Sequence, residues 1–210
     1  MIGNKLDNKK KSTKKELSSL AKKKYLPSEI LLFKEKAKLT RHKNIKQKLH
    51  RYVYRYRFAR SFNGIVVEDI GLTKTGYESG MRIFLAYTTY ELLVETAYRF
   101  NKPPTRHITT NQVIDIELAD KVRLNKKLMN FLNDSTKDFE QKKELDKFIN
   151  SENHSIALVA FLIRNAYAHG DFTAGGMGLM KQEECNVIDN MTVTLLDYCD
   201  DIFSKCVELL

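Results

Sequence analysis

Three polar side chains stand at the end of the most apolar stretch of the chain. Arg164, Asn165 and His169 follow the run from Ile156 to Ile163, in which every residue is apolar. A guanidinium offers a planar fork of donors that suits an anion, and an imidazole changes charge near neutral pH, so it can act as a general acid or base. Polar groups at the end of a core helix need partners or a function. The alternative is a core helix whose last turn reaches solvent, with Arg164 in a salt bridge and His169 as a C-cap.

The spacing of these residues constrains what one helix can do with them. At about 100° per residue, Asn165 and His169 lie on one face, whereas Arg164 and His169 diverge by about 140°. A single helix therefore positions the arginine and the histidine poorly around one phosphate. Two copies that meet about a two-fold axis would bring both motifs to a shared cleft.

The elements that must position this motif are predicted to be helices. Apolar periodicity and capping signals predict helices over residues 29–38, 44–60, 79–100, 135–150 with Ser135 as N-cap, 152–169 and 186–209, and one or two helices over 112–133. Gly170 is expected to end the helix of the motif, and loops are expected around Gly64, Gly71 and Gly76. Short strands over 51–58 and 64–67 are an alternative. The pattern predicts an all-α helical bundle, residues 26–210, after a basic tail, residues 1–25, that is flexible or a frayed helix.

Positive charge is concentrated at the N-terminal end of the chain. Residues 1–60 contain 20 of the 36 Lys and Arg residues and only 4 of the 26 Asp and Glu residues, a net charge of +16, whereas residues 61–210 carry −6. Such an asymmetry indicates a polyanionic partner, of which nucleic acid is the commonest. A solvated tail that aids solubility is the alternative for the first 25 residues.

The segment from His50 to Arg60 alternates cations with aromatic rings. Stacking on unpaired bases and contact with phosphates call for this combination. It predicts an RNA-binding segment that uses Arg51, Arg55, Arg57, Arg60, Tyr52 and Tyr56. The alternative is an amphipathic helix with buried rings and arginines whose stems lie along the apolar surface.

The sequence Arg-Asn-x-x-Ala-His-Gly, residues 164–170, resembles the signature of HEPN domains, which is an arginine, four to six residues, and a histidine, often with a polar residue beside the arginine. The resemblance extends over about 81–210 in architecture. It implies a helical bundle of HEPN type and a metal-independent endoribonuclease, in which the 2′-hydroxyl of RNA attacks the adjacent phosphate at an active site shared by a homodimer. Arg164 would hold the phosphate, His169 would transfer protons, and Asn165 would orient either. A role as a toxin or antiviral defence effector, with an antitoxin or defence-system partner, would follow.

Two further features qualify this expectation. HEPN toxins commonly carry a tyrosine two residues after the histidine, where this chain has Asp171. Glu91 and Glu95 lie on an otherwise apolar helix, so that one of them could orient Arg164, or both could face solvent. A non-catalytic HEPN-like module that binds RNA or a protein, and a helical scaffold protein, are the alternatives to an enzyme.

The remaining composition excludes several classes of protein. The three cysteines, Cys185, Cys199 and Cys206, show neither a disulfide framework nor zinc-ligand spacing, so reduced structural thiols, no metal and no cofactor are expected. The longest apolar run has eight residues, too few to span a bilayer, and no signal peptide is indicated. A cytoplasmic protein without membrane contact is the prediction.

Overall fold

The computed structural model describes residues 28–39, 43–66, 71, 73–101 and 113–208. Within these ranges the chain forms eight helices and no strand, so the prediction of an all-α bundle is confirmed. The helices are α2 (Ser28–Leu39), α3 (Lys43–Ser61), α4 (Thr73–Asn101), α5 (Ile116–Leu124), α6 (Lys126–Ser135), α7 (Phe139–Ile149), α8 (Ile156–His169) and α9 (Gln182–Glu208). The predicted tail, residues 1–25, lies outside the described residues.

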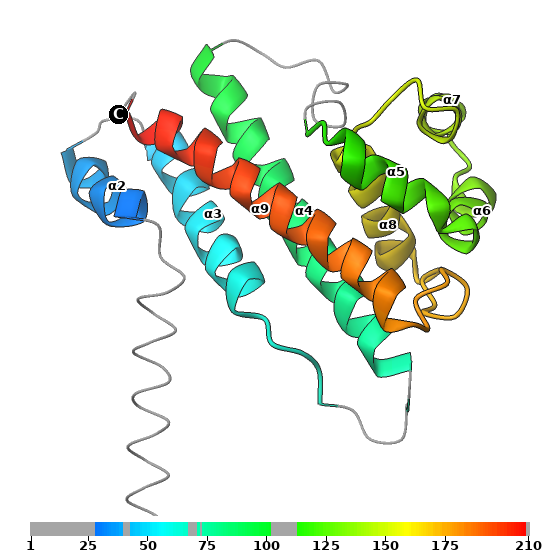
Figure 1. The fold of residues 1–210 in the computed structure, drawn as a ribbon. Helices are drawn as coiled ribbons and strands as arrows, with labels where there is room; N and C mark the ends of the chain where they lie inside the picture. The colour runs from blue at the N-terminus through cyan, green and yellow to red at the C-terminus, as the bar shows by residue number, and fades with distance from the viewer. Residues whose placement is uncertain (1–27, 40–42, 67–70, 72, 102–112, 209–210) are drawn as a thin grey trace, which may run out of the picture.

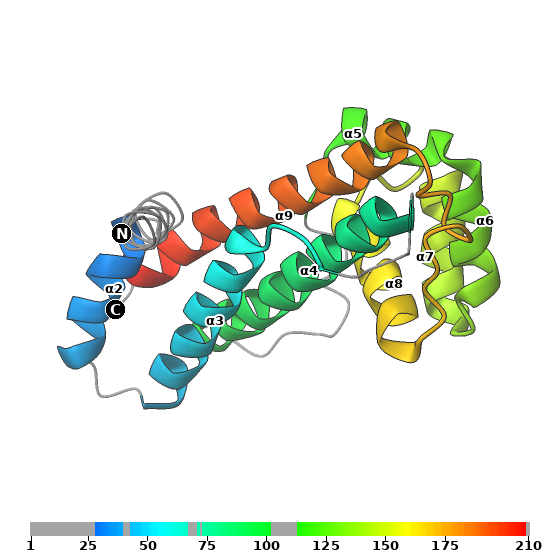
Figure 2. The ribbon, with the colours of Figure 1, turned by 90° about the horizontal axis from the view of Figure 1, so that it is seen from below.

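Two long helices form the axis of the bundle. Helices α4 and α9 lie side by side and run in the same direction, and α3 packs against α4 in the opposite direction (Figure 1, Figure 2). Helix α2 packs on the C-terminal end of α9, where the rings of Phe33 and Phe203 are 5.6 Å apart between centroids. Buried residues from all eight described helices belong to one hydrophobic cluster, so these helices share a core.

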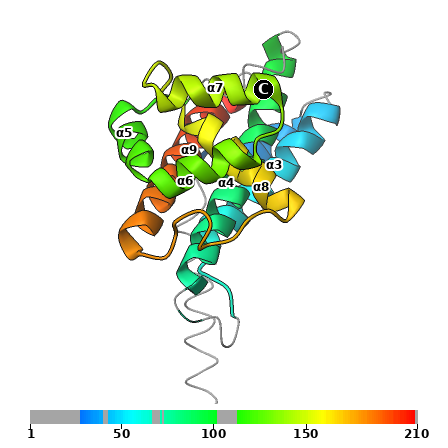
Figure 3. The same cartoon turned by 90° about the vertical axis from the view of Figure 1, so that its right-hand side faces the viewer.

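The short helices gather at the other end of the bundle. Figure 3 shows α5, α6 and α7 on the side that faces the viewer, with α8 beside them. Helix α8 contacts α4 on one side and α6 and α7 on another, so it lies between the long helices and the short ones. Every residue from Ile156 to Ala160 is buried, as expected for the centre of a bundle. The apolar run therefore fixes α8 in the core and leaves its last turn at the surface.

The start of α4 differs from the prediction. The helix begins at Thr73 rather than near residue 79, and Gly76, expected in a loop, lies inside it. A Cβ atom on Gly76 would overlap the carbonyl oxygen of Leu179, and one on Gly80 would overlap the ring of Phe172. The two glycines therefore serve close packing of the 170–181 loop against α4, rather than a break in the helix.

Other helix boundaries also needed correction. Region 112–133 contains two helices, and Asn125 joins them because its side chain accepts a hydrogen bond from the backbone N–H of Leu128. Ser135 is the last residue of α6 and not the N-cap of α7; Asp138 takes that role. Helix α8 begins at Ile156 rather than 152, after the N-cap Ser155, and α9 begins at Gln182 rather than 186. Short capping residues compete for these ends, which makes single positions hard to predict.

The alternative of strands is wrong for the segment 51–58, which lies inside α3. Residues 64–66 are irregular, and the one β-bridge among the described residues joins Ile114 to Ser155. No helix in the described ranges is both long enough and apolar enough to cross a membrane.

Candidate active site at the end of helix α8

The last turn of α8 is closed by a left-handed glycine. Gly170 has φ +79°, and the backbone N–H groups of Asp171 and Phe172 both donate to the carbonyl oxygen of Ala166, at 2.9 Å and 3.2 Å. The ring of Phe172 packs on Tyr167 at 4.7 Å between centroids, which turns the chain back toward α4. This ending gives the carbonyl oxygens of Ala166 and Tyr167 hydrogen-bond donors from the backbone that follows the helix. His169 is exposed on the final turn.

Arg164 points toward helix α4. Its Nη2 atom lies 2.8 Å from Oε2 of Glu91, and its Nη1 atom donates to Oδ1 of Asn165 at 2.9 Å. Its guanidinium also lies 6.0 Å from the ring centre of Tyr87. The side chain of Arg164 keeps 27% of its surface exposed. A guanidinium has five N–H donors, so these contacts leave donor capacity for an anion at the surface.

The two acids on α4 have different partners. Glu91 contacts Arg164, whereas the Oε1 atom of Glu95 lies 2.6 Å from Nζ of Lys48 on α3. Of the two candidates for orienting Arg164, the structure brings only Glu91 to it. The same contact agrees with the alternative that Arg164 is a salt-bridged residue at the end of a core helix.

His169 lies on another side of α8 and lines an open pocket. The pocket has a volume of about 440 Å³ and also contains Asn165, Leu162, Ala166 and Asp171 of this helix and its loop; residues 135–138 and Gln141 form the opposite wall. Within the described part of the chain, no side chain is hydrogen-bonded to the imidazole of His169. The histidine is therefore accessible to a ligand in the pocket.

Asn165 is the one motif residue that meets both sides. It accepts the hydrogen bond of Arg164 and lines the pocket of His169. Arg164 itself does not line that pocket. The divergence of about 140° that an ideal helix imposes is thus realised: one chain directs the arginine toward α4 and the histidine toward the connection between α6 and α7.

Lys137 is a candidate site residue that the sequence did not reveal. It lines the His169 pocket and an adjoining one of about 540 Å³, and Ser135 and Asp171 also line both. The carboxylate of Asp138 is engaged as the N-cap of α7, 2.9 Å from the N–H of Gln141. Among the residues that line the His169 pocket, Lys137 is therefore the lysine placed to meet an anion. Its sequence neighbourhood shows no motif, and only the fold of α6 onto α8 brings it to His169.

The predicted RNA-binding set on α3 needs correction. Tyr52 and Tyr56 are 0% and 2% exposed and belong to the core, so no ring face is available to a base. Nη2 of Arg60 lies 2.6 Å and 3.0 Å from Asp197 and Asp200 of α9. Arg51 and Arg55 are exposed, and Arg57 is half-buried. The rings that do face outward on this helix are Tyr54 and Phe58, at 69% and 58% exposure.

The cysteines and other possible metal ligands are not part of this site. Cys185, Cys199 and Cys206 are buried and unpaired, and burial raises the pKa of the Cys206 thiol to about 11. These thiols therefore stay protonated near neutral pH. Among the residues that the structure describes, no three His, Cys, Asp or Glu side chains are grouped so as to hold a metal ion.

Comparison of the whole chain with protein-family models, curated proteins and solved structures gave no match. The resemblance of residues 164–170 to the HEPN signature stays a prediction.

Proposed function

We propose that the chain is a metal-independent endoribonuclease of HEPN type whose active site forms when two copies pair. The observation that carries the proposal is the shared position of Asn165, which is hydrogen-bonded to Arg164 and lines the open pocket of the exposed His169. Because Arg164 and His169 leave α8 on different sides, pairing about a two-fold axis is the arrangement that would let one chain's arginine meet the other chain's histidine.

The reaction would need no metal ion, because these side chains transfer the protons and stabilise the charge. One imidazole takes the proton of the RNA 2′-hydroxyl while the 2′-oxygen forms a bond to phosphorus. The bond from phosphorus to the 5′-oxygen breaks, and the imidazolium that has formed returns its proton to that leaving oxygen. Arg164 stabilises the charge on the non-bridging oxygens. The products would be a 2′,3′-cyclic phosphate and a 5′-hydroxyl end.

Purified protein incubated with total RNA in EDTA tests this proposal. The wild type should cleave, and His169→Ala should lower the rate by about 10²- to 10⁴-fold, the usual contribution of a general acid or base. Arg164→Ala should lower it by about 10²-fold or more. Fragments should accept a phosphate from polynucleotide kinase directly, because their 5′ ends carry a hydroxyl.

Two matched variants control for general effects of these substitutions. His154→Ala removes a half-buried imidazole outside the pocket, and Arg82→Ala removes an ion-paired arginine, which contacts Asp189 at 3.0 Å. Both should retain the wild-type rate. Cleavage that persists in His169→Ala, or fragments that need phosphatase treatment before labelling, would contradict the mechanism.

A non-catalytic RNA-binding module is the second candidate function. It is favoured by the contact of Glu91 with Arg164, which neutralises part of the arginine's charge in a single chain. Intact RNA after incubation with the wild type, together with binding that weakens as salt is raised, would select this alternative.

A further inference from the structure

The outer face of α3 carries two exposed rings between exposed cations. Tyr54 and Phe58 are four residues apart, and Arg51 and Arg55 occupy the neighbouring positions on the same side of the helix. The ring of Phe58 meets Phe62 edge-on, with 6.4 Å between centroids. The opposite face of α3 is the buried one and includes Leu49, Tyr52, Val53, Tyr56 and Ala59. We call Arg51, Tyr54, Arg55 and Phe58 the outer face of α3.

Helix α3 has no acidic residue and seven lysines and arginines in its 19 positions. Among the described side chains, the ion-paired cations of α3 are Lys48, which pairs with Glu95 of α4, and Arg60, which pairs with Asp197 and Asp200 of α9. Arg55 donates to the carbonyl oxygen of Thr88 at 3.3 Å, and no described acidic side chain pairs with Arg51, Arg55 or Arg57. The outer face therefore keeps a net positive charge.

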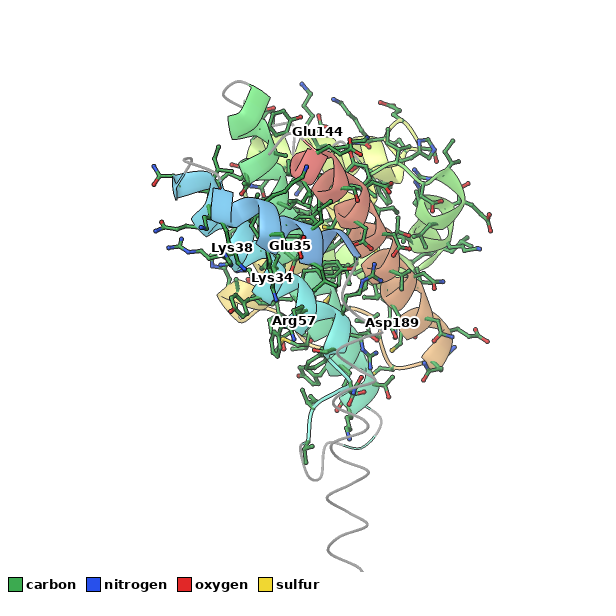
Figure 4. The ribbon with its side chains drawn as sticks, turned by 90° about the vertical axis from the view of Figure 1, so that its left-hand side faces the viewer. Lys34, Glu35, Lys38, Arg57, Glu144 and Asp189 are labelled. Carbon is green, nitrogen blue, oxygen red and sulfur yellow. The ribbon has the colours of Figure 1, made fainter. Side chains whose placement is uncertain are left out.

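Exposed basic residues are also present on helix α2, at the same end of the molecule as α3. Figure 4 looks at the end of the molecule where α2 and α3 lie and labels Lys34 and Lys38 of α2 and Arg57 of α3. Lys34 and Lys38 are exposed, and the same helix also carries the acidic residues Glu29 and Glu35. These lysines add to the positive charge at that end of the molecule.

We propose that the outer face of α3 binds a single-stranded segment of RNA. Tyr54 and Phe58 supply ring faces on which unpaired bases stack, while Arg51 and Arg55 contact the phosphates between them. The choice of RNA among polyanions rests on the proposed function. A second copy of the chain fits this face less well, because a two-fold axis through it would place the same arginines against each other.

Helix α4 connects the outer face of α3 to the candidate active site, because it contacts both. Arg55 touches the backbone of Thr88 on α4, Thr88 and Glu91 are three residues apart on that helix, and Glu91 contacts Arg164. Residues three apart in a helix are neighbours on its surface. RNA held on α3 would therefore have to cross only partly buried residues of α4, such as Thr88 and Glu91, to reach Arg164, so we infer that α3 holds the strand beside the cleavage site.

Fluorescence anisotropy with a labelled oligouridylate tests this proposal. Measurements in the His169→Ala background separate binding from cleavage. Tyr54→Ala and Phe58→Ala should each weaken binding by about five-fold or more, the lower end of what one stacked base contributes, whereas Tyr54→Phe should keep the affinity. Phe139→Ala is the matched control, because Phe139 is 77% exposed but lies on α7. It should leave binding unchanged.

The arginines and the strandedness of the RNA give two further readouts. Arg51→Ala should lower the slope of log affinity against log salt by about 1, and duplex RNA should compete poorly because its bases are already stacked. Equal affinities for Tyr54→Ala, Phe58→Ala and Phe139→Ala would overturn the proposal. So would a change from dimer to monomer in sedimentation that accompanies Tyr54→Ala while binding is retained, because the face would then be a protein interface.

The outcome distinguishes this inference from the proposed function. Loss of binding in the two ring variants, with no cleavage by the wild type, would support the single-strand site and reject the nuclease. Cleavage by the wild type with unaltered binding in the ring variants would support the nuclease and reject the single-strand site.

Discussion

Of the three residues in the motif, Arg164 is the one whose side chain contacts two other polar side chains. Glu91 holds one nitrogen of its guanidinium and Asn165 holds another, at 2.8 Å and 2.9 Å. Glu91 is 38% exposed, so solvent screens this ion pair and its contribution to stability is small. We therefore interpret Glu91 as a positioning residue that aims the arginine.

The variant Glu91→Gln separates positioning from stability. Removing the carboxylate frees positive charge on Arg164 but loosens its orientation, so RNA affinity should stay the same or rise while the cleavage rate falls by about ten-fold. Single-turnover cleavage and anisotropy measure the two effects. Glu95→Gln, which removes the partner of Lys48 instead, is the control. Equal rates for the two glutamine variants would rule out a positioning role for Glu91.

The residues of the motif could be predicted from the sequence, but their partners could not. The type and spacing of Arg164, Asn165 and His169 indicate chemistry, and helical geometry alone gives the divergence of the arginine from the histidine. Lys137 lies far from them in the sequence, and nothing local marks it. Only the packing of α6 and α7 on α8 brings it near His169.

At the scale of elements, α3 shows how periodicity outweighs composition. The alternation of arginine and tyrosine predicted that Tyr52 and Tyr56 bind RNA. Both rings are instead buried, on the same face of α3 as Leu49, Val53 and Ala59. This spacing of three and four residues marks the core face of a helix. Applying it strictly would have identified Tyr54 and Phe58 as the outward rings.

Helix α4 depends on glycine for its contact with the loop that follows the motif. A Cβ atom at Gly76 would collide with backbone of that loop, at the carbonyl oxygen of Leu179. Gly76→Ala should therefore lower the free energy of unfolding by about 1 to 2 kcal/mol, because overpacking outweighs the gain in helix propensity. Denaturant titration measures it.

Gly175→Ala is the matched control for this prediction. Gly175 is exposed in the same loop, and the nearest atom to an added Cβ would be Sδ of Met180 at 3.9 Å. Its substitution should change stability by less than about 0.5 kcal/mol. If Gly76→Ala proves as stable as Gly175→Ala, the close packing that we assign to Gly76 is not a constraint on the fold.

The contact of α3 with α9 should make stability depend on pH. Burial raises the pKa of Asp200 above its ordinary value, despite the opposing effect of Arg60. A carboxyl group with a raised folded-state pKa favours the fold while it is protonated, and this contribution is lost as the pH rises through that pKa. Asp200→Asn mimics the protonated form, so its stability relative to the wild type should increase from about pH 3.5 to pH 7.

Urea unfolding of both proteins at the two pH values measures this difference. Asp197→Asn controls for the loss of an ion pair to Arg60, because Asp197 contacts the same guanidinium from a more exposed position. A stability difference between Asp200→Asn and the wild type that stays constant, or that shrinks as the pH rises, would show that burial does not govern the ionisation of Asp200.

In the whole molecule, a basic face lies beside a helical core. The sequence alone revealed the basic N-terminal third and the all-helical class, because both follow from composition and periodicity. It could not reveal that α4 places the outer face of α3 and the motif of α8 on its two sides, since long-range packing decides this. The proposed pairing of two chains would likewise depend on surfaces and not on local sequence.

The central claim is that Arg164 of one chain acts with His169 of another. Mixing His169→Ala with Arg164→Ala by co-refolding tests it most directly, because about half of the dimers then carry one intact arginine and one intact histidine on different chains. RNA cleavage in EDTA should be nearly absent for each variant alone and should return to a substantial fraction of the wild-type rate in the mixture. A mixture as inactive as its components, under conditions where the wild type cleaves, would contradict the claim.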